Sequence, residues 1–282
     1  MNTIKTGILM SVLSVLLVFM GSALGGKSGA IIFFVISLGI NFFSYYYSDK
    51  MVIKMTRSRL ISEEQAPDLY SIVRNLTQRA GLPMPTLYIT PSAQANAFAT
   101  GRNPEHAAVA VTEGLMKILN REEVEGVLAH EIAHIKNRDI LIGTIAASMA
   151  GAISMIANVI QWGAMFGGLG GQNDDEGGVG LFGMLAMAIL APIAALLVQM
   201  AISRSREYLA DQSGALLAGH SSGLSNALLK LEQASQRVPM QVTAAASHLF
   251  IVNPLSGGAL LSLFSTHPPI NERVNRLRLM AV

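Results

Sequence analysis

The sequence predicts a mainly α-helical membrane protein in which four transmembrane helices carry a cytoplasmic α+β domain with a small sheet. Two observations lead to this prediction. Of the 282 residues, 51% are hydrophobic and only 13% are charged, a balance that is unusual for a soluble chain. The apolar residues are concentrated in four uncharged runs, whereas the segments between these runs have the mixed patterns of a soluble domain.

The first two uncharged runs, Gly7–Gly26 and Ser28–Ser48, are separated only by Lys27. Each has about the 20 residues that a helix needs to cross a bilayer. The first run, which Lys5 precedes, also has the features of a cleaved signal peptide. The second run follows so closely that a transmembrane hairpin over residues 1–48 is the better interpretation.

The third and fourth runs, Ile140–Met165 and Val179–Ser203, predict a second transmembrane hairpin over residues 140–203. The segment between them is rich in glycine and carries three acidic residues but no Lys or Arg, as expected of a loop outside the cell. The alternative is a buried helical hairpin in a large soluble fold. The length of both runs favours the membrane.

Basic residues set the predicted orientation. Lys50, Lys54, Arg57 and Arg59 follow the first hairpin, and the positive-inside rule places them in the cytoplasm. The cytoplasmic domain is then made of two parts, residues 49–139 and 204–282, and both chain termini are cytoplasmic.

The soluble segments carry local signals for helices and strands. Pro67 suits the first turn of a helix that Gly81 ends, and Asn120 with Glu123 forms a variant of the capping box at the start of a later helix. The predicted helices are 67–80, 113–119, the helix that starts after Asn120, 204–217 and 224–236, and the predicted strands are 86–90, 96–101 and 106–111. The remainder is a tail punctuated by proline.

Composition excludes two classes of site. The chain has no cysteine, so it has no disulfide framework and no thiolate metal site, and any metal must be held by His, Asp or Glu. The net charge is +2 and the basic residues are dispersed, so no nucleic-acid partner is expected. The sequence carries no signal for an oligomeric state.

The motif His130-Glu131-Ile132-Ala133-His134 has the pattern H-E-x-x-H. On a helix, residues four apart share a face, so His130 and His134 point toward one position. Two such histidines are half of a catalytic zinc site, which takes three protein ligands and leaves one position open.

The best candidate for the third ligand is Glu207. An antiparallel second hairpin would return the chain beside its starting point, which brings Glu207 near the two histidines. The alternative is a solvated carboxylate paired with an arginine. Asp211, one helical turn further, is placed to accept a hydrogen bond from a zinc-bound histidine. Asp139 is the second choice for either role, because its i+5 offset from His134 points it off the shared face.

Two residues are candidates for the chemistry itself. Glu131 cannot readily chelate from the same helix and suits the role of general base, which takes a proton from the attacking water. His267 is held stiffly by the prolines that follow it and is the candidate donor to the developing oxyanion. The alternative for His267 is an ordinary surface histidine.

Together these motifs resemble those of the HtpX family of bacterial integral-membrane zinc metalloproteases and, more distantly, the proteases that trim CAAX-prenylated proteins. The resemblance extends over the whole chain and includes the segments Asn96–Gly101 and Glu207–Asp211. It implies a zincin-like metalloprotease domain with one zinc ion per chain, bound by His130, His134 and Glu207, with Glu131 as base, Asp211 behind the ligands and His267 stabilising the transition state.

The resemblance also implies a substrate platform and a cellular role. The segment Asn96, Ala97, Phe98, Ala99 and Thr100 matches the edge strand of the family, along which an unfolded substrate can pair. A core strand is the alternative. The implied location is the bacterial inner membrane, and the implied partners are the lipid bilayer and misassembled membrane proteins, which the protease degrades as quality control.

Two other hypotheses compete with this one. The first is a protease of narrow, CAAX-type specificity. The second is a membrane scaffold or transporter without enzymatic activity. Against the second, the four uncharged runs contain no Asp, Glu, Lys, Arg or His, so no ion pathway is visible in them.

Overall fold

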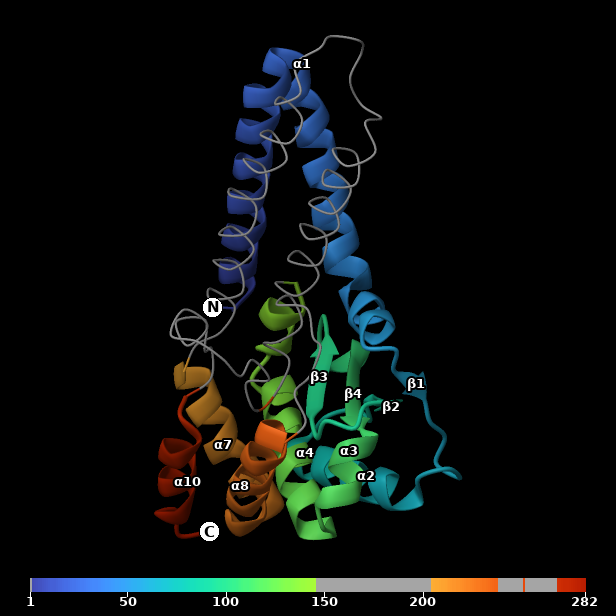
Figure 1. The fold of residues 1–282 in the computed structure, drawn as a ribbon, viewed down its shortest axis with the longest axis vertical. Coiled ribbons are helices and arrows are strands. Elements are labelled where there is room, and N and C mark those ends of the chain that lie inside the picture. Colours follow the sequence, from blue (N-terminus) through green and yellow to red (C-terminus); the bar gives the residue numbers. More distant parts are fainter. Residues whose placement is uncertain (1, 146–203, 238–250, 252–267) are drawn as a thin grey trace.

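The computed structural model describes residues 2–145, 204–237, 251 and 268–282. In Figure 1 the long helix α1 (Asn2–Met55) extends away from a body in which several helices pack around a small sheet. The chain is therefore mainly helical with one sheet, as predicted. Most of the predicted second hairpin, residues 146–203, lies outside the described residues.

Helix α1 forms two antiparallel arms (Figure 1). The chain reverses at Gly26, whose φ of +56° is a backbone conformation that favours glycine. Gly21 and Gly29 then let the arms approach closely, because a Cβ on either would collide with the carbonyl oxygen of the other. Lower down, Asn41 Nδ2 donates a hydrogen bond of 2.8 Å to Ser14 Oγ across the arms. Residues 2–55 therefore form a helical hairpin, and its insertion in the membrane stays a prediction.

One segment of the described residues, Gly26–Tyr47, is a helix long and apolar enough to cross a membrane. The other arm contains the apolar helix Thr6–Phe19, which is shorter than a full span. The total of four transmembrane helices accordingly stays a prediction.

The sheet has four strands in the order β1 (Arg59–Leu60), β2 (Thr86–Thr90), β4 (Ala107–Thr112) and β3 (Ala97–Gly101). Strands β2 and β4 are parallel, and the other two pairs are antiparallel. The three predicted strands are confirmed to within one residue at their ends. Strand β1 was not predicted, because two residues are too few to show a period.

Strand β3 is at the edge of this sheet in the described part of the chain. Its alternate side chains point to opposite faces. Ala97 and Ala99 pack with the main helical core, whereas Phe98 is buried against Val52 of α1 and Ala110 of β4. The strand is thus fixed between α1 and the helices of the body.

Three helices of this part of the chain begin where the sequence predicts. Helix α2 (Pro67–Ala80) starts at its proline and ends at Gly81, with φ of +68°. The short 3₁₀ helix η1 (Pro104–His106) leads into β4, and α3 (Glu113–Ile118) follows β4. Helix α4 (Arg121–Lys136) begins with the predicted capping box between Asn120 and Glu123.

The C-terminal part of the body contains α7 (Arg204–Ala218), α8 (Ser222–Arg237) and α10 (Ile270–Arg278). Helices α7 and α8 are confirmed. Helix α10 is a correction, because it lies in the segment that was predicted to be a tail. Helix α4 packs against α2, α7 and α8 and is buried over most of its length.

A glycine brings α7 directly onto α4. A Cβ at Gly214 would lie 2.9 Å from the backbone nitrogen of His130 and 3.0 Å from its Cα, which is closer than side chains normally approach a backbone. Only glycine allows this separation of the two helices. It places Asp211 and Glu207, which lie about one and two turns before Gly214 on α7, beside the histidine motif on α4.

Candidate metal centre

Three side chains from α4 and α7 converge at one point. The Nε2 atoms of His130 and His134 are 3.1 Å apart. Glu207 Oε1 lies 3.6 Å from His134 Nε2, and Glu207 Oε2 lies 3.8 Å from His130 Nε2. One ligand atom from each of the three residues falls within 4.8 Å of the others. The structure therefore brings together the three ligands that the sequence predicts.

The donor atoms of this group fit a zinc ion. Zinc binds imidazole nitrogen and carboxylate oxygen at about 2.0–2.2 Å, which separates neighbouring ligand atoms of a tetrahedron by roughly 3.3–3.6 Å. The two imidazole nitrogens are 3.1 Å apart, and each lies 3.6 or 3.8 Å from its nearer Glu207 oxygen, which are separations of this size. Two imidazoles and one carboxylate leave the fourth position open, as hydrolytic zinc sites require.

Asp211 lies behind His130, as the sequence predicts. Its Oδ1 is 3.0 Å from His130 Nδ1, which is a hydrogen-bonding distance. Burial by itself raises the pKa of Asp211, but the charge and the hydrogen bonds of Arg273 hold it at about 2. Asp211 is therefore an ionised acceptor facing His130.

Asp139 lies behind His134. Its carboxylate oxygens are 3.0 and 3.1 Å from His134 Nδ1. Burial lowers the pKa of His134, but the charge and the hydrogen bond of Asp139 outweigh it and raise this pKa to about 10. The sequence-based expectation that Asp139 points off the shared face is wrong. That expectation assumed a continuous helix, whereas α4 ends at Lys136 and Arg138 adopts φ of +55°, which turns the chain back.

Glu131 connects the metal group to the edge strand. Its carboxylate is buried, and Oε2 accepts a hydrogen bond of 2.8 Å from the backbone N–H of Ala99 in β3. Burial raises the pKa of Glu131 to about 7, and the charge of Glu207 adds to this rise, whereas His134 and the Ala99 N–H oppose it. A carboxylate with this pKa can both accept and release a proton near neutral pH.

The side chains of the predicted substrate-binding residues are mostly enclosed by the protein. Asn96 is buried, and its Oδ1 accepts a hydrogen bond of 3.0 Å from the N–H of Ile251. Phe98 is enclosed between β4 and α1, and Thr100 is fully buried, with Oγ1 3.2 Å from Thr144 Oγ1. Of the five residues, Ala99 is the one that is partly exposed. His267, the predicted oxyanion donor, lies outside the described residues.

Two residues near the centre were not singled out from the sequence. Gly214 could have been noticed, since a glycine within a helical pattern often marks a close approach of two backbones. Arg273 is fully buried and pairs with Asp211 through Nε and a terminal nitrogen, at 2.9 and 2.7 Å. Its position in a segment predicted to be a tail gave no sign of this contact.

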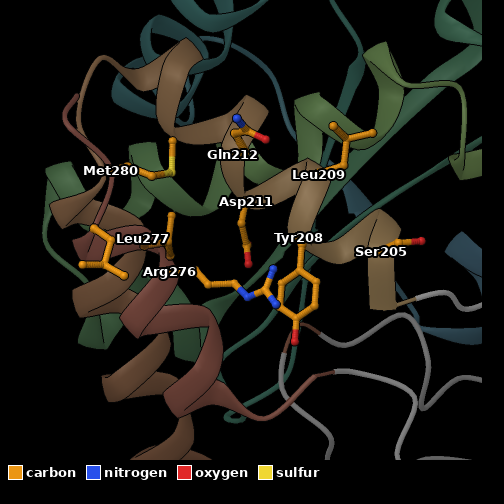
Figure 2. A pocket seen from close by; sticks show the side chains of 9 residues that line it. Ser205, Tyr208, Leu209, Asp211, Gln212, Arg276, Leu277 and Met280 are labelled. Atoms are coloured by element: carbon orange, nitrogen blue, oxygen red, sulfur yellow. The ribbon is translucent and has the colours of Figure 1, made fainter.

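A cavity of about 500 Å³ opens between α7 and α10, with Asp211 among the residues that line it (Figure 2). Arg276 lies against the ring of Tyr208 there, 3.8 Å from its centroid, and Leu209 and Met280 line the walls. None of the three metal-binding candidates lines this cavity.

A donor set of this kind, beside a buried carboxylate and a sheet edge, is typical of the hydrolytic zinc enzymes. Comparison with known proteins specifies which group of these enzymes is meant. The model of peptidase family M48 matches residues 63–281, and the chain belongs to this family.

Its relatives are described as protease HtpX homologues. One from Pelotomaculum thermopropionicum is 68% identical, and the match covers the whole of both chains. One from Desulfatibacillum aliphaticivorans is 57% identical over 98% of this chain and 89% of its own. One from Thermococcus kodakarensis is 53% identical over 99% and 96%. The resemblance to the HtpX family is confirmed, and the chain is a membrane zinc metalloprotease.

The fold also resembles the crystal structure of S. mikatae Ste24p, with a TM-score of 0.52 and 20% identity. The match covers 98% of this chain and 64% of that chain, so this chain spans less than two thirds of its length. This likeness concerns the fold alone.

Proposed function

We propose that the chain is an endopeptidase of the bacterial inner membrane that degrades misfolded or damaged membrane proteins as part of quality control. In this proposal His130, His134 and Glu207 hold the zinc ion and Glu131 is the general base. One observation carries the proposal: the Glu131 carboxylate is in contact with the edge strand through Ala99 and belongs to the same motif as the two histidines. Base, metal ligands and a surface for an extended peptide thus meet at one place.

Each side chain of the site has its own role in peptide hydrolysis. Zinc, when bound, acts as a Lewis acid toward the scissile carbonyl and lowers the pKa of water. Glu131 accepts the proton of the attacking water and passes it to the leaving amine, a task that suits its pKa of about 7. Asp211 and Asp139 hold the two imidazoles by their distal nitrogens. His267 as donor to the developing oxyanion stays a prediction.

The edge of β3 that no strand of the described residues occupies supports an extended substrate, which would take over two N–H groups that now donate to side chains. The N–H groups of Ala99 and Gly101 point away from β4, since they donate to Glu131 and to Thr144 Oγ1. A peptide that adds to this edge would pair with the backbone by β-augmentation. Only a chain segment that can become fully extended can bind in this way, which favours unfolded proteins as substrates.

The packing of α1 supports a site close to the membrane surface. Val52, beyond the apolar arm of α1, packs against Phe98 of the edge strand, and Arg102 stacks on Tyr46 with 5.6 Å between its guanidinium and the ring centroid. We propose two transmembrane hairpins, residues 1–48 and 140–203. The two parts of the protease domain, residues 49–139 and 204–282, then lie in the cytoplasm.

Replacing Glu131 by Gln should abolish cleavage and leave zinc bound. Glutamine has almost the same shape but cannot take a proton, so we expect a fall in kcat of at least about 100-fold. The measurement is kcat for an unfolded membrane protein in detergent, together with zinc content by elemental analysis.

Two variants complete this experiment. Glu63→Gln, which removes an exposed carboxylate paired with Arg74, serves as the matched control and should keep wild-type activity. His267→Ala should retain zinc and cleave more slowly. Undiminished proteolysis by Glu131→Gln would rule out the proposed base.

Backbone methylation of a peptide substrate tests the pairing with β3. In an extended strand, every second N–H faces the partner edge. Methyl groups on these amides should prevent binding and raise KM at least about tenfold, whereas methyl groups on the alternate amides should be tolerated. Equal effects of the two methylation patterns on KM would contradict β-augmentation.

A short prenylated peptide, assayed alongside, should be cleaved more slowly than the unmodified unfolded substrate if the narrow CAAX-type hypothesis is wrong.

Single cysteines test the orientation, because the chain has no cysteine of its own. Ser28→Cys lies at the turn of α1, Gly171→Cys lies in the predicted second outside loop, and Ser62→Cys lies in the cytoplasmic part. A maleimide that cannot cross the membrane should label the first two in intact cells and should label Ser62→Cys only after lysis. Labelling of Ser62→Cys in intact cells would reverse the orientation, and protection of Gly171→Cys would argue against the second hairpin.

A further inference from the structure

We propose that Arg273 is a positioning residue of the zinc site, which holds the Asp211 carboxylate against His130 and thereby sets the affinity for zinc without touching the metal. This inference rests on the proposed role of His130 as a zinc ligand. Arg273 comes from α10, has no exposed surface and is 62 residues from Asp211 in sequence.

The guanidinium of Arg273 forms a bidentate ion pair with both carboxylate oxygens of Asp211. Arg273 Nε donates to Oδ2 at 2.9 Å, and a terminal nitrogen donates to Oδ1 at 2.7 Å. The same Oδ1 lies 3.0 Å from His130 Nδ1. A planar fork of this kind fixes the plane of the carboxylate, which a lysine ammonium, as a point charge, cannot do. Rotation of Asp211 away from His130 would break both hydrogen bonds to Arg273.

The second terminal nitrogen of Arg273 links the metal group to the edge strand. It donates to the carbonyl oxygen of Ile251 at 3.2 Å, and the N–H of Ile251 donates to Asn96 Oδ1 at 3.0 Å. Asn96 directly precedes β3. One side chain therefore connects the carboxylate behind His130 to the start of the proposed substrate platform.

A purely structural role explains less of this geometry. Holding α10 on α7 would not require an ion pair, because well-packed apolar residues stabilise such a contact as well as a buried ion pair does. The direction of the change in zinc affinity also distinguishes the charge of Arg273 from its orientation of Asp211. Its charge lies 4.0 Å from Glu207 Oε2 and by itself disfavours a nearby dication. Weaker zinc binding after its removal therefore reports the loss of orientation.

The test is the zinc affinity of the full chain in detergent, measured on metal-stripped protein by competition with a chromophoric chelator. Arg273→Met should weaken zinc binding about 10- to 100-fold, the usual effect of losing a partner behind a ligand, and Arg273→Lys should be intermediate. In an Asp211→Asn background, Arg273→Met should lower the zinc affinity by less than about threefold further. Both substitutions remove the same interaction, so their effects should not add. The proposal is overturned if Arg273→Met binds zinc as tightly as the wild type. It is also overturned if the losses of zinc affinity caused by Arg273→Met and Asp211→Asn add fully in the double variant.

Arg273→Met leaves Asp211 as a buried unpaired charge and could therefore fail to fold. In that case the double variant Asp211→Asn/Arg273→Met still tests the proposal. It lacks both charges, and its zinc affinity should lie within about threefold of that of Asp211→Asn. A further tenfold loss in the double variant contradicts the proposal.

Two controls separate the possible causes of failure. Arg79 binds the other end of α7 through the carbonyl oxygens of Leu217 and Ala218, at 2.9 and 3.1 Å. Arg79→Met should lower the melting temperature and leave the zinc affinity unchanged. A loss of zinc affinity equal to that of Arg273→Met would mean that any weakening of the packing of α7 lowers zinc affinity, which contradicts the proposal. His130→Ala should lose zinc in every case. If it does so while Arg273→Met binds normally, only the role of Arg273 fails, whereas normal zinc binding by His130→Ala refutes the proposed site itself.

Discussion

The direct contact of α7 with α4 at Gly214 is the constraint on which the metal centre depends. His130 and His134 lie one turn apart on α4, and Glu207 and Asp211 lie one turn apart on α7. Two helices that cross closely can set such pairs face to face, provided that no side chain separates their backbones. At Gly214 the backbone of α7 approaches that of His130 more closely than a Cβ would permit. The spacing of ligands along each helix is local, but their convergence is a property of this contact.

The second feature of the centre is the number of charges that it buries. Glu131, Glu207, Asp211 and Asp139 are all buried, together with Arg273. Isolated buried charges are strongly unfavourable, and each needs hydrogen bonds or an opposite charge nearby. Asp211 has Arg273, Asp139 has His134, and Glu131 has the N–H of Ala99. This arrangement fixes the imidazoles from behind and leaves their Nε2 atoms directed toward Glu207.

The sequence predicts those parts of the site that follow from local spacing. The capping box at Asn120 locates the start of α4, and the i, i+4 spacing locates the ligand face. The choice of Glu207 needed an argument about chain topology. Asp139 departs from the prediction because Arg138 adopts a left-handed conformation, so the helical geometry that the i+5 offset assumes does not continue to Asp139. Arg273 could not be found in this way, since its partner is 62 residues distant and no period in the sequence connects them.

The central claim is that the chain forms one zinc site from two imidazoles of α4 and one carboxylate of α7. X-ray absorption at the zinc edge of the purified full chain tests it most directly, alongside the zinc content. We predict one zinc ion per chain with two imidazole ligands and only nitrogen and oxygen donors, and a loss of bound zinc in Glu207→Ala. Zinc bound with a single imidazole, or retained at full stoichiometry in Glu207→Ala, would contradict the account.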